Sequence, residues 1–231
     1  MIVLKFGGTS VGNAANIKKV SDIIYSYSEP KIVVLSAVAG TTNSLVAINE
    51  AIANLQPKEA LKRIDALEQS YLPLINELFS KEQYLSEAAT FLKNQFNHLR
   101  AISGNIVNEK EILAQGELLS TNLFQIYQQE LGRDSALIPA LDYMAIDEHG
   151  EPVTDAISTK LGALLKSRAK TSTFITQGYI CRNELGEIDN LKRGGSDYSA
   201  SLIGAAIRAS EIQICTDIPG MHNNDPRYVE N

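Results

Sequence analysis

The sequence predicts an α/β protein in which a mainly parallel sheet is covered by helices on both faces. Residues 1–6 and 31–38 are short, continuous apolar runs, which are typical of parallel strands buried on both sides. Between them, residues 16–27 place apolar side chains at helical spacing. Residues 58–131 are helical in pattern almost throughout and are expected to form a helical insertion between strands. The order strand, helix, strand is the opening of a parallel α/β sheet.

The remaining elements follow from local patterns taken in chain order. Pro30 ends the first helix, and a loop at 39–43 leads into a second helix near Ser44. Apolar repeats at intervals of three and four predict three helices within the insertion, at 61–78, 91–99 and 112–127. Downstream, strands are expected at 135–139, 173–180 and 211–216, helices at 154–170 and 198–208, a hairpin partner strand at 188–191, and a loop from 217 to 231.

Composition limits the class of protein. The chain has 231 residues and is 44% hydrophobic, enough for one large domain or two small ones. Its net charge of −6 gives no bulk electrostatic reason to bind nucleic acid or an anionic membrane. It contains no run of 18 apolar residues and no basic, hydrophobic leader, so we expect a cytoplasmic protein. Cys181 and Cys215 lie in apolar segments outside any metal or redox spacing, which predicts buried free thiols.

A glycine-rich turn follows the first strand. Lys5 and Phe6 close the strand, and Gly7, Gly8, Thr9 and Ser10 follow. Adjacent glycines let a ligand approach the backbone, and successive amide groups in such a turn form a concave anion site. A lysine and two hydroxyl groups complete the parts needed to hold a phosphate. The pattern is neither the P-loop nor the dinucleotide fingerprint, and alone it fits equally well with a tight strand–helix turn bearing a surface lysine.

A second segment, Lys192 to Asp197, repeats this design. Gly194 and Gly195 precede a predicted helix, whose N-terminus carries partial positive charge. The fork of Arg193 suits a carboxylate or a phosphate. By position alone, Asp197 is better explained as an ordinary N-cap than as a functional carboxylate.

Five motifs follow one another along the chain: KFGGTSV at 5–11, LSA with TN at 35–43, GELLS at 116–120, RGGSDY at 193–198, and TDIPG with DPR at 216–227. In this order they resemble the motifs of the aspartate kinases, members of the amino-acid kinase superfamily. The similarity extends from residue 2 to about residue 229. The resemblance implies a three-layer αβα sandwich and transfer of the ATP γ-phosphate to the side-chain carboxylate of L-aspartate, the first step toward lysine, threonine and methionine.

The resemblance also implies roles for particular residues. Lys5 would neutralise charge on the transferring phosphoryl group, and Asp197 would organise the reacting groups, for example by orienting Lys5. Phosphoryl transfer depends mainly on positioning and charge stabilisation, which this equipment can supply. L-Aspartate would be held by Ser36, Thr42, Glu117, Arg193, Gly194, Gly195 and Ser196. Without the resemblance, Glu117 would be interpreted as a solvent-exposed helix carboxylate.

The nucleotide would be held by Lys5, Phe6, Gly7, Gly8, Thr9, Ser10, Thr216, Asp217, His222 and Arg227. The resemblance implies ATP with Mg²⁺, and Mg²⁺ would bridge the ATP phosphates with few protein ligands because it keeps its waters readily. No protein metal site is therefore expected. Two positions depart from the family pattern: His222 stands where Tyr is usual, and Lys192 replaces a Gly before Arg193, which adds a charge and a Cβ beside the substrate loop.

The resemblance leads us to expect a single catalytic domain, 1–231, that stops before a C-terminal segment with a second nucleotide lysine and before ACT regulatory domains. Homo-oligomerisation of a full-length parent through those domains is expected. Two alternatives stay open. One is a related amino-acid kinase that acts on glutamate, acetylglutamate, carbamate or a nucleoside monophosphate. The other is a nucleotide-binding fragment without turnover.

Overall fold

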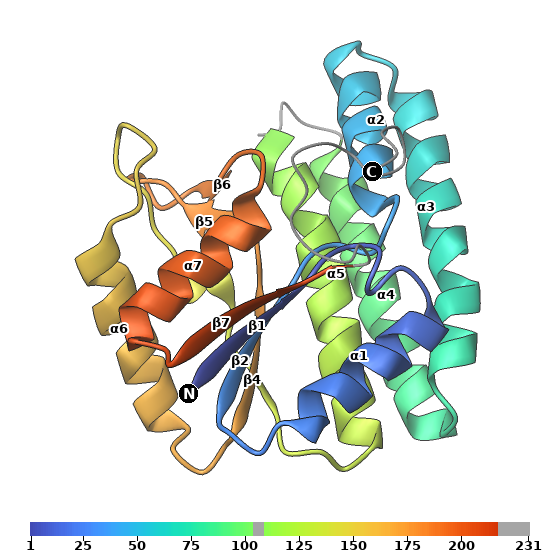
Figure 1. The fold of residues 1–231 in the computed structure, drawn as a ribbon. Coiled ribbons are helices and arrows are strands. Elements are labelled where there is room, and N and C mark those ends of the chain that lie inside the picture. The colour runs from blue at the N-terminus through green and yellow to red at the C-terminus, as the bar shows by residue number, and fades with distance from the viewer. Residues whose placement is uncertain (104–108, 217–231) are drawn as a thin grey trace, which may run out of the picture.

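A five-stranded parallel sheet forms the centre of the molecule. The computed structural model describes residues 1–103 and 109–216. The strands lie in the order β3-β4-β2-β1-β7, and every neighbouring pair is parallel. Their bounds are β1 (Ile2–Phe6), β2 (Lys31–Leu35), β3 (Ala136–Leu137), β4 (Thr173–Gln177) and β7 (Glu211–Cys215). Because all five run in one direction, their carboxyl ends meet at one edge of the sheet (Figure 1).

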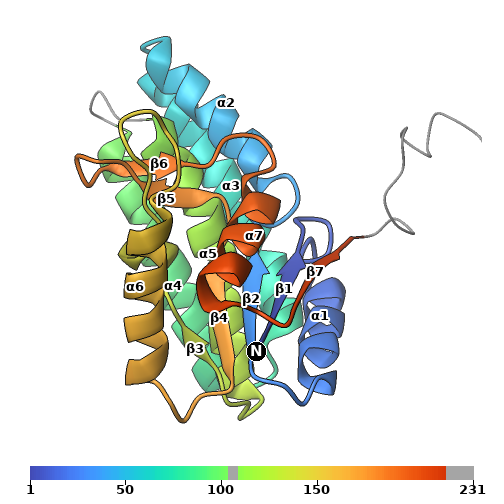
Figure 2. The ribbon, with the colours of Figure 1, turned by 60° about the vertical axis from the view of Figure 1, so that its left-hand side comes forward.

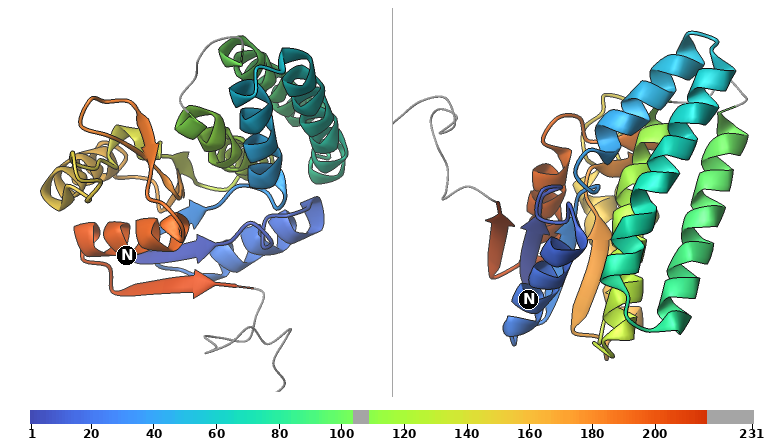
Figure 3. Two further views of the ribbon diagram at one scale, coloured as in Figure 1. Left: turned by 90° about the horizontal axis from the view of Figure 1, so that it is seen from above. Right: turned by 90° about the vertical axis from the view of Figure 1, so that its right-hand side faces the viewer.

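Helices cover both faces of this sheet (Figure 3). One side carries α1 (Ala14–Ser26), α2 (Thr41–Ala53), α3 (Pro57–Leu78), α4 (Glu82–Ile102) and α5 (Glu109–Glu130). The other side carries α6 (Thr154–Ser167) and α7 (Gly195–Ile207), with a short 3₁₀ helix at Ala140–Asp142. Figure 2 shows α7 in front of the strands and α6 to their left. The expected αβα sandwich is confirmed. Within the two described ranges, no helix is both long and apolar enough to cross a membrane.

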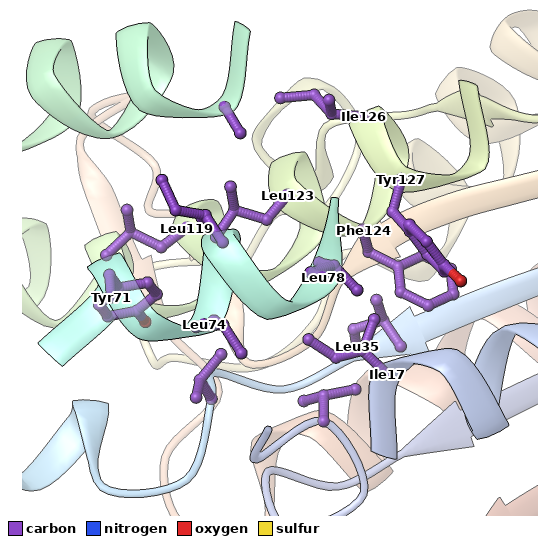
Figure 4. Close-up of a cluster of buried hydrophobic side chains, with 14 of the residues drawn as sticks. Ile17, Leu35, Tyr71, Leu74, Leu78, Leu119, Leu123, Phe124, Ile126 and Tyr127 are labelled. Atoms are coloured by element: carbon purple, nitrogen blue, oxygen red, sulfur yellow. The ribbon is translucent and has the colours of Figure 1, made fainter. Parts of the chain in front are cut away.

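Side chains that point to opposite faces of the sheet in alternation divide the core into two clusters. Leu4 and Phe6 of β1 face the cluster formed with α1 to α5, whereas Val3 faces the cluster formed with α6 and α7. This is the two-residue period of a strand buried on both sides. Figure 4 shows part of the larger cluster, where Leu74 and Leu78 of α3 approach the same region as Leu35. The sheet is thereby fixed between two apolar layers, and its loops are carried on a rigid frame.

The three helices predicted within the insertion are confirmed, and α5 proves to be the most deeply placed of them. It packs against the sheet as well as against α2 and α4, and most of its residues are buried. Two of its charged residues are therefore buried, whereas Glu109 at its start is exposed. Glu130 is buried and accepts hydrogen bonds from the amides of Ser80 and Lys81, at 2.8 and 2.6 Å, just before α4 begins. Glu117 is buried on the same helix.

The single strand expected at 173–180 is divided in two. Tyr179 adopts a left-handed backbone, with φ of +67°, and turns the chain out of the sheet. The following strand, β5 (Ile180–Arg182), pairs with antiparallel β6 (Ile188–Asn190), which confirms the predicted hairpin. Cys181 is a buried free thiol, as expected, but Cys215 is only partly buried because β7 is an edge strand. The loop predicted at 217–231 lies outside the described residues.

Candidate active site

A cavity of about 460 Å³ opens at the carboxyl edge of the sheet. It lies where the segments following β1, β2 and β4 meet the start of α7. Open parallel sheets bind ligands in the crevice outside their strand ends, so this location is the expected one. The cavity is lined by Lys5, Gly8, Ser36, Ala37, Val38, Ala39, Gly40, Thr42, Glu117, Tyr179, Lys192, Arg193, Gly194, Gly195, Ser196 and Asp197.

The loop after β1 is held against the loop after β2 through Gly8. The carbonyl of Gly8 accepts hydrogen bonds from the amides of Ala39, at 3.1 Å, and Val11, at 3.3 Å. A Cβ on Gly8 would lie 2.8 Å from the carbonyl oxygen of Ala37, so this close approach requires glycine. Within the described part of the chain, the amides of Gly8, Thr9 and Ser10 donate to no protein acceptor. Three successive amides left free in a turn form an anion-binding concavity.

Lys5 and Asp197 form an ion pair at the wall of the cavity. Lys5 Nζ lies 2.7 Å from Asp197 Oδ1. The Lys5 side chain is only 12% exposed, and that of Asp197 is 54% exposed. The largely buried lysine is thus held by a carboxylate on the α7 side of the cavity. Its ammonium also lies near the first loop, 3.5 Å from where a Cβ on Gly7 would stand.

The turn before α7 shows that Asp197 is not the N-cap that its position in the sequence suggested. The N-cap of α7 is Gly194, with φ of +76°, and α7 begins at Gly195. Asp197 is therefore the third helical residue, where its side chain turns toward Lys5 and does not cap the helix. A glycine suits the left-handed cap because it has no Cβ. Gly195 has a second constraint, since a Cβ there would lie 2.8 Å from the ring of Tyr179.

Glu117 reaches the cavity from the middle of α5. Only 5% of the residue is exposed, which overturns the interpretation as a solvent-exposed carboxylate. One of its side-chain oxygens accepts a hydrogen bond from the amide of Ala37, at 3.4 Å. Burial raises the pKa of Glu117 from 4.5 to about 8, because the charged form loses its solvation. Within the described residues no cation pairs with it, so the site holds a buried acid suited to receiving a positively charged group.

Thr42 is placed by the N-terminus of α2. The preceding Thr41 is buried, and its hydroxyl lies 2.8 Å from the hydroxyl of Tyr71 on α3. Gly40, the N-cap of α2, adopts φ of +85° and lets the chain turn from the loop after β2 into the helix. The amide of Thr41 donates to the carbonyl of Val38 at 3.0 Å, which closes this turn. Ser36 and Thr42, at the two ends of this loop, both line the cavity.

The structure brings most of the predicted site residues together, but not all. Ten line the cavity: Lys5, Gly8, Ser36, Thr42, Glu117, Arg193, Gly194, Gly195, Ser196 and Asp197. Gly7, Thr9 and Ser10 lie in the adjoining first loop without lining it. The Phe6 side chain is 2% exposed and packs in the core, so only its main chain remains available to a ligand. Thr216 directly follows β7, and Asp217, His222 and Arg227 lie outside the described residues.

Sequence reasoning missed Tyr179 as part of this site. Its half-buried ring lines the cavity, and burial raises its pKa to about 12. Its amide donates to Ser199 Oγ at 2.9 Å, and its carbonyl accepts from the amide of Leu191 at 2.8 Å. The signal that could have found it is Gly178, which directly follows a buried strand at the same sheet edge as Gly7 and Ser36. We instead extended the strand through both residues.

Comparison with known proteins adds independent findings. The chain is 32% identical to the lysine-sensitive aspartokinase 3 of Escherichia coli (strain K12) over 234 residues, covering 99% of this chain and 51% of that protein. It is 31% identical to the aspartokinase of Chlamydia pneumoniae over 228 residues, covering 99% of this chain and 50% of that protein. The chain thus spans about half the length of these curated relatives.

A solved structure shares the fold. The crystal structure of E. coli aspartokinase III in complex with aspartate and ADP superposes with a TM-score of 0.84 at 32% identity, covering 98% of this chain and 51% of that one. The family model of the amino acid kinase family matches residues 1–231. With the parallel sheet, the glycine-rich loops and the cavity at the strand ends, this match shows that the chain belongs to the amino acid kinase family.

Proposed function

We propose that this chain is an aspartate kinase catalytic domain, which transfers the γ-phosphate of ATP to the side-chain carboxylate of L-aspartate. The observation that carries the proposal is the charge arrangement of one cavity. A buried acid, Glu117, lies at one wall, and Arg193 lies at another. An amino acid presents an ammonium and a carboxylate, so it matches both. The relatives named for aspartate phosphorylation, one of them solved with aspartate and ADP, support the same assignment.

In this proposal, the residues of the cavity divide between the two substrates. Glu117 binds the ammonium group of aspartate, while Arg193 and Ser196 bind carboxylate oxygens and Thr42 and Ser36 contact the amino acid from the opposite wall. The amides of Gly8, Thr9 and Ser10 hold phosphate oxygens. Binding both substrates in one cavity converts a bimolecular encounter into a positioned reaction, which is a large part of catalysis.

The chemical step needs positioning and positive charge more than a base. The aspartate side chain is ionised near pH 7, so its oxygen can attack the γ-phosphorus directly while ADP departs. Lys5 neutralises the charge that spreads over the transferring group, and Asp197 holds the lysine at 2.7 Å so that it does not need to reorganise during the step. Mg²⁺ would supply further charge neutralisation and would arrive bound to ATP. Among the described residues, no three His, Cys, Asp or Glu gather as a metal site.

Calorimetric titration with a panel of acceptors tests the substrate assignment. In the presence of ADP and Mg²⁺, L-aspartate should bind, and L-glutamate should bind about tenfold more weakly because one extra methylene must fit the same cavity. Arg193→Gln should weaken aspartate binding, whereas Arg168→Gln, on the far end of α6, should not. Tighter binding of glutamate, acetylglutamate or a nucleoside monophosphate would favour the related kinases. Binding of ADP with none of these acceptors would favour a nucleotide-binding fragment.

A further inference from the structure

Lys192 has an unfavourable backbone conformation at the wall of the cavity. Its φ is +61°, a left-handed value that residues with a Cβ rarely adopt. The strained residue is held on both sides: its amide donates to Asn190 Oδ1 at 3.0 Å, and its carbonyl accepts from the amide of Gly195 at 3.0 Å. Such strain persists where the surrounding structure imposes it, and it concentrates at functional sites. Glycine would adopt this conformation more readily but would carry no charge.

Lys192 lines two neighbouring cavities. One is the cavity described above, and the other is a neighbouring cavity of about 370 Å³. The second cavity is predominantly acidic, being lined by Asp147, Glu148, Glu184 and Asp189 together with Lys110, His149 and Lys192. The Lys192 ammonium lies 3.6 Å from where a Cβ on Gly150 would stand, which is an ordinary contact distance, and Gly150 lines the second cavity.

The cationic side chains that line the site cavity differ in whether a carboxylate pairs with them. Lys5 is paired with Asp197. Within the described residues, neither Lys192 nor Arg193 has an Asp or Glu oxygen within 4.0 Å. The turn before α7 therefore carries two adjacent cations without an ion-pair partner among the described residues. Aspartate carries two carboxylates and one ammonium, so Arg193 alone leaves one negative charge of the substrate without a cation on this wall.

We propose that Lys192 is a specificity-determining residue that attracts acidic amino acids into the site cavity and away from the acidic cavity beside it. The inference rests on the proposed function, because it takes L-aspartate as the substrate. The cation acts on the net negative charge of the substrate, so it favours aspartate over asparagine, which has the same shape and no net charge. Like other exposed charges, its contribution is screened by salt.

The test separates charge from backbone conformation with three variants. Lys192→Gln keeps the left-handed strain and loses the charge, Lys192→Gly loses both, and Lys192→Arg keeps both. We expect Gln and Gly to weaken aspartate binding by about fivefold at low salt, the upper range for an exposed charge pair, and Arg to change it by less than twofold. Affinity for asparagine should be the same in all four proteins. Raising the salt concentration should weaken aspartate binding by wild type until its affinity approaches that of Lys192→Gln.

A matched control is available on α7. Arg208 is also an exposed cation with a left-handed backbone, with φ of +51°, but it lies at the far end of that helix and lines neither cavity. Arg208→Gln and Arg208→Gly should leave aspartate binding unchanged. Calorimetry gives the affinities, and a thermal melt confirms that each variant is folded.

The outcomes distinguish this inference from the proposed function. If wild type binds no aspartate, the proposed function fails, and the inference fails with it. If wild type binds aspartate but Lys192→Gln binds it within twofold, the inference alone is overturned. It is also overturned if aspartate and asparagine weaken equally, because Lys192 would then shape the loop and not select charge.

Discussion

Glu117 combines deep burial with a place in the cavity. A buried carboxylate is costly to ionise, and here its side chain accepts a long hydrogen bond from the amide of Ala37. The folded pKa of about 8 lies above the ordinary value of 4.5, so the folded protein holds a proton that the unfolded chain releases between these values. Stability of the ligand-free protein should therefore fall as pH rises from about 4.5 to about 8.

Replacing Glu117 with Gln tests this linkage. The amide is neutral and of nearly the same shape, so Glu117→Gln should lose much of the decline in unfolding free energy between pH 5.5 and pH 8.5. Urea unfolding at both pH values measures the difference. Glu87→Gln, on the exposed face of α4, is the matched control and should keep the wild-type slope. An unchanged slope in Glu117→Gln would show that Glu117 is ionised across this range.

The same residue predicts proton release when the substrate binds. An ammonium beside Glu117 favours the carboxylate, so binding of aspartate at pH 7 should release roughly one proton. Calorimetry in phosphate and in Tris measures it, because the two buffers differ in ionisation enthalpy. Glu117→Gln should release none and bind aspartate about 10- to 100-fold more weakly, since a hydrogen bond to a charged group is lost. Equal binding heats in both buffers for wild type would contradict the role of Glu117.

Gly8 shows how one absent side chain holds two loops together. A Cβ there would meet the carbonyl of Ala37 at 2.8 Å, so Gly8→Ala must push the first loop away from the second. We expect a loss of about 1–3 kcal/mol in unfolding free energy, together with weaker ADP binding. Gly162→Ala is the control: nothing lies within 4 Å of a Cβ at that position inside α6, so this variant should gain about 0.5–1 kcal/mol. Thermal melts with and without ADP would contradict this account if the two variants behaved alike.

Among the helices, α3 contacts the N-terminus of α2, which carries a residue of the cavity. The hydroxyl of Tyr71, which is buried on α3, lies 2.8 Å from the hydroxyl of Thr41, the first residue of α2. Tyr71 also packs its ring edge-on against Phe96 of α4, with ring centroids 5.9 Å apart. The helical insertion thus anchors the N-terminus of α2, where Thr42 lines the cavity.

Removing this anchor should affect binding more than the fold. Tyr71→Phe keeps the ring packing and should cost about 1 kcal/mol of stability, the net worth of one hydrogen bond. We expect weaker aspartate binding and unchanged ADP binding, because α2 borders the acceptor side. Thr41→Val removes the other partner, and the double variant should be no worse than the more affected single variant. Additive losses would mean that the two hydroxyls act independently.

Elements were predictable where the pattern was repetitive. The apolar runs of β1 and β2 and the helical spacing of α3 predicted those elements because tertiary packing agreed with local preference. The break at Tyr179 was not predictable from propensity, since a tyrosine with positive φ is imposed by its surroundings. The prediction that Asp197 caps α7 was wrong for a related reason. Asp is preferred at N-caps in general, but the N-cap of α7 has a left-handed backbone, which Gly194 adopts readily.

At the scale of the molecule, parallel strand direction gathers the site. Lys5, Ser36 and Asp197 are far apart in sequence, yet each lies at a strand end or at the helix start that meets the same edge. The resemblance of motifs could identify these residues. The alternation of buried strands with helices predicted a parallel sheet, and this could place the residues at one edge. Burial of Glu117 and the free charges of Lys192 and Arg193 depend on how α5 and the turn before α7 pack, which no local pattern encodes.

Formation of aspartyl phosphate by wild type and by Lys5→Met tests the central claim most directly. The chain is incubated with ATP, Mg²⁺ and L-aspartate, and the acyl phosphate is trapped with hydroxylamine. We predict hydroxamate formation by wild type and a loss of about 100-fold or more in Lys5→Met, equivalent to about 3 kcal/mol of transition-state stabilisation. Wild-type activity that survives in Lys5→Met, or wild type that binds both substrates and forms no hydroxamate, would contradict the account.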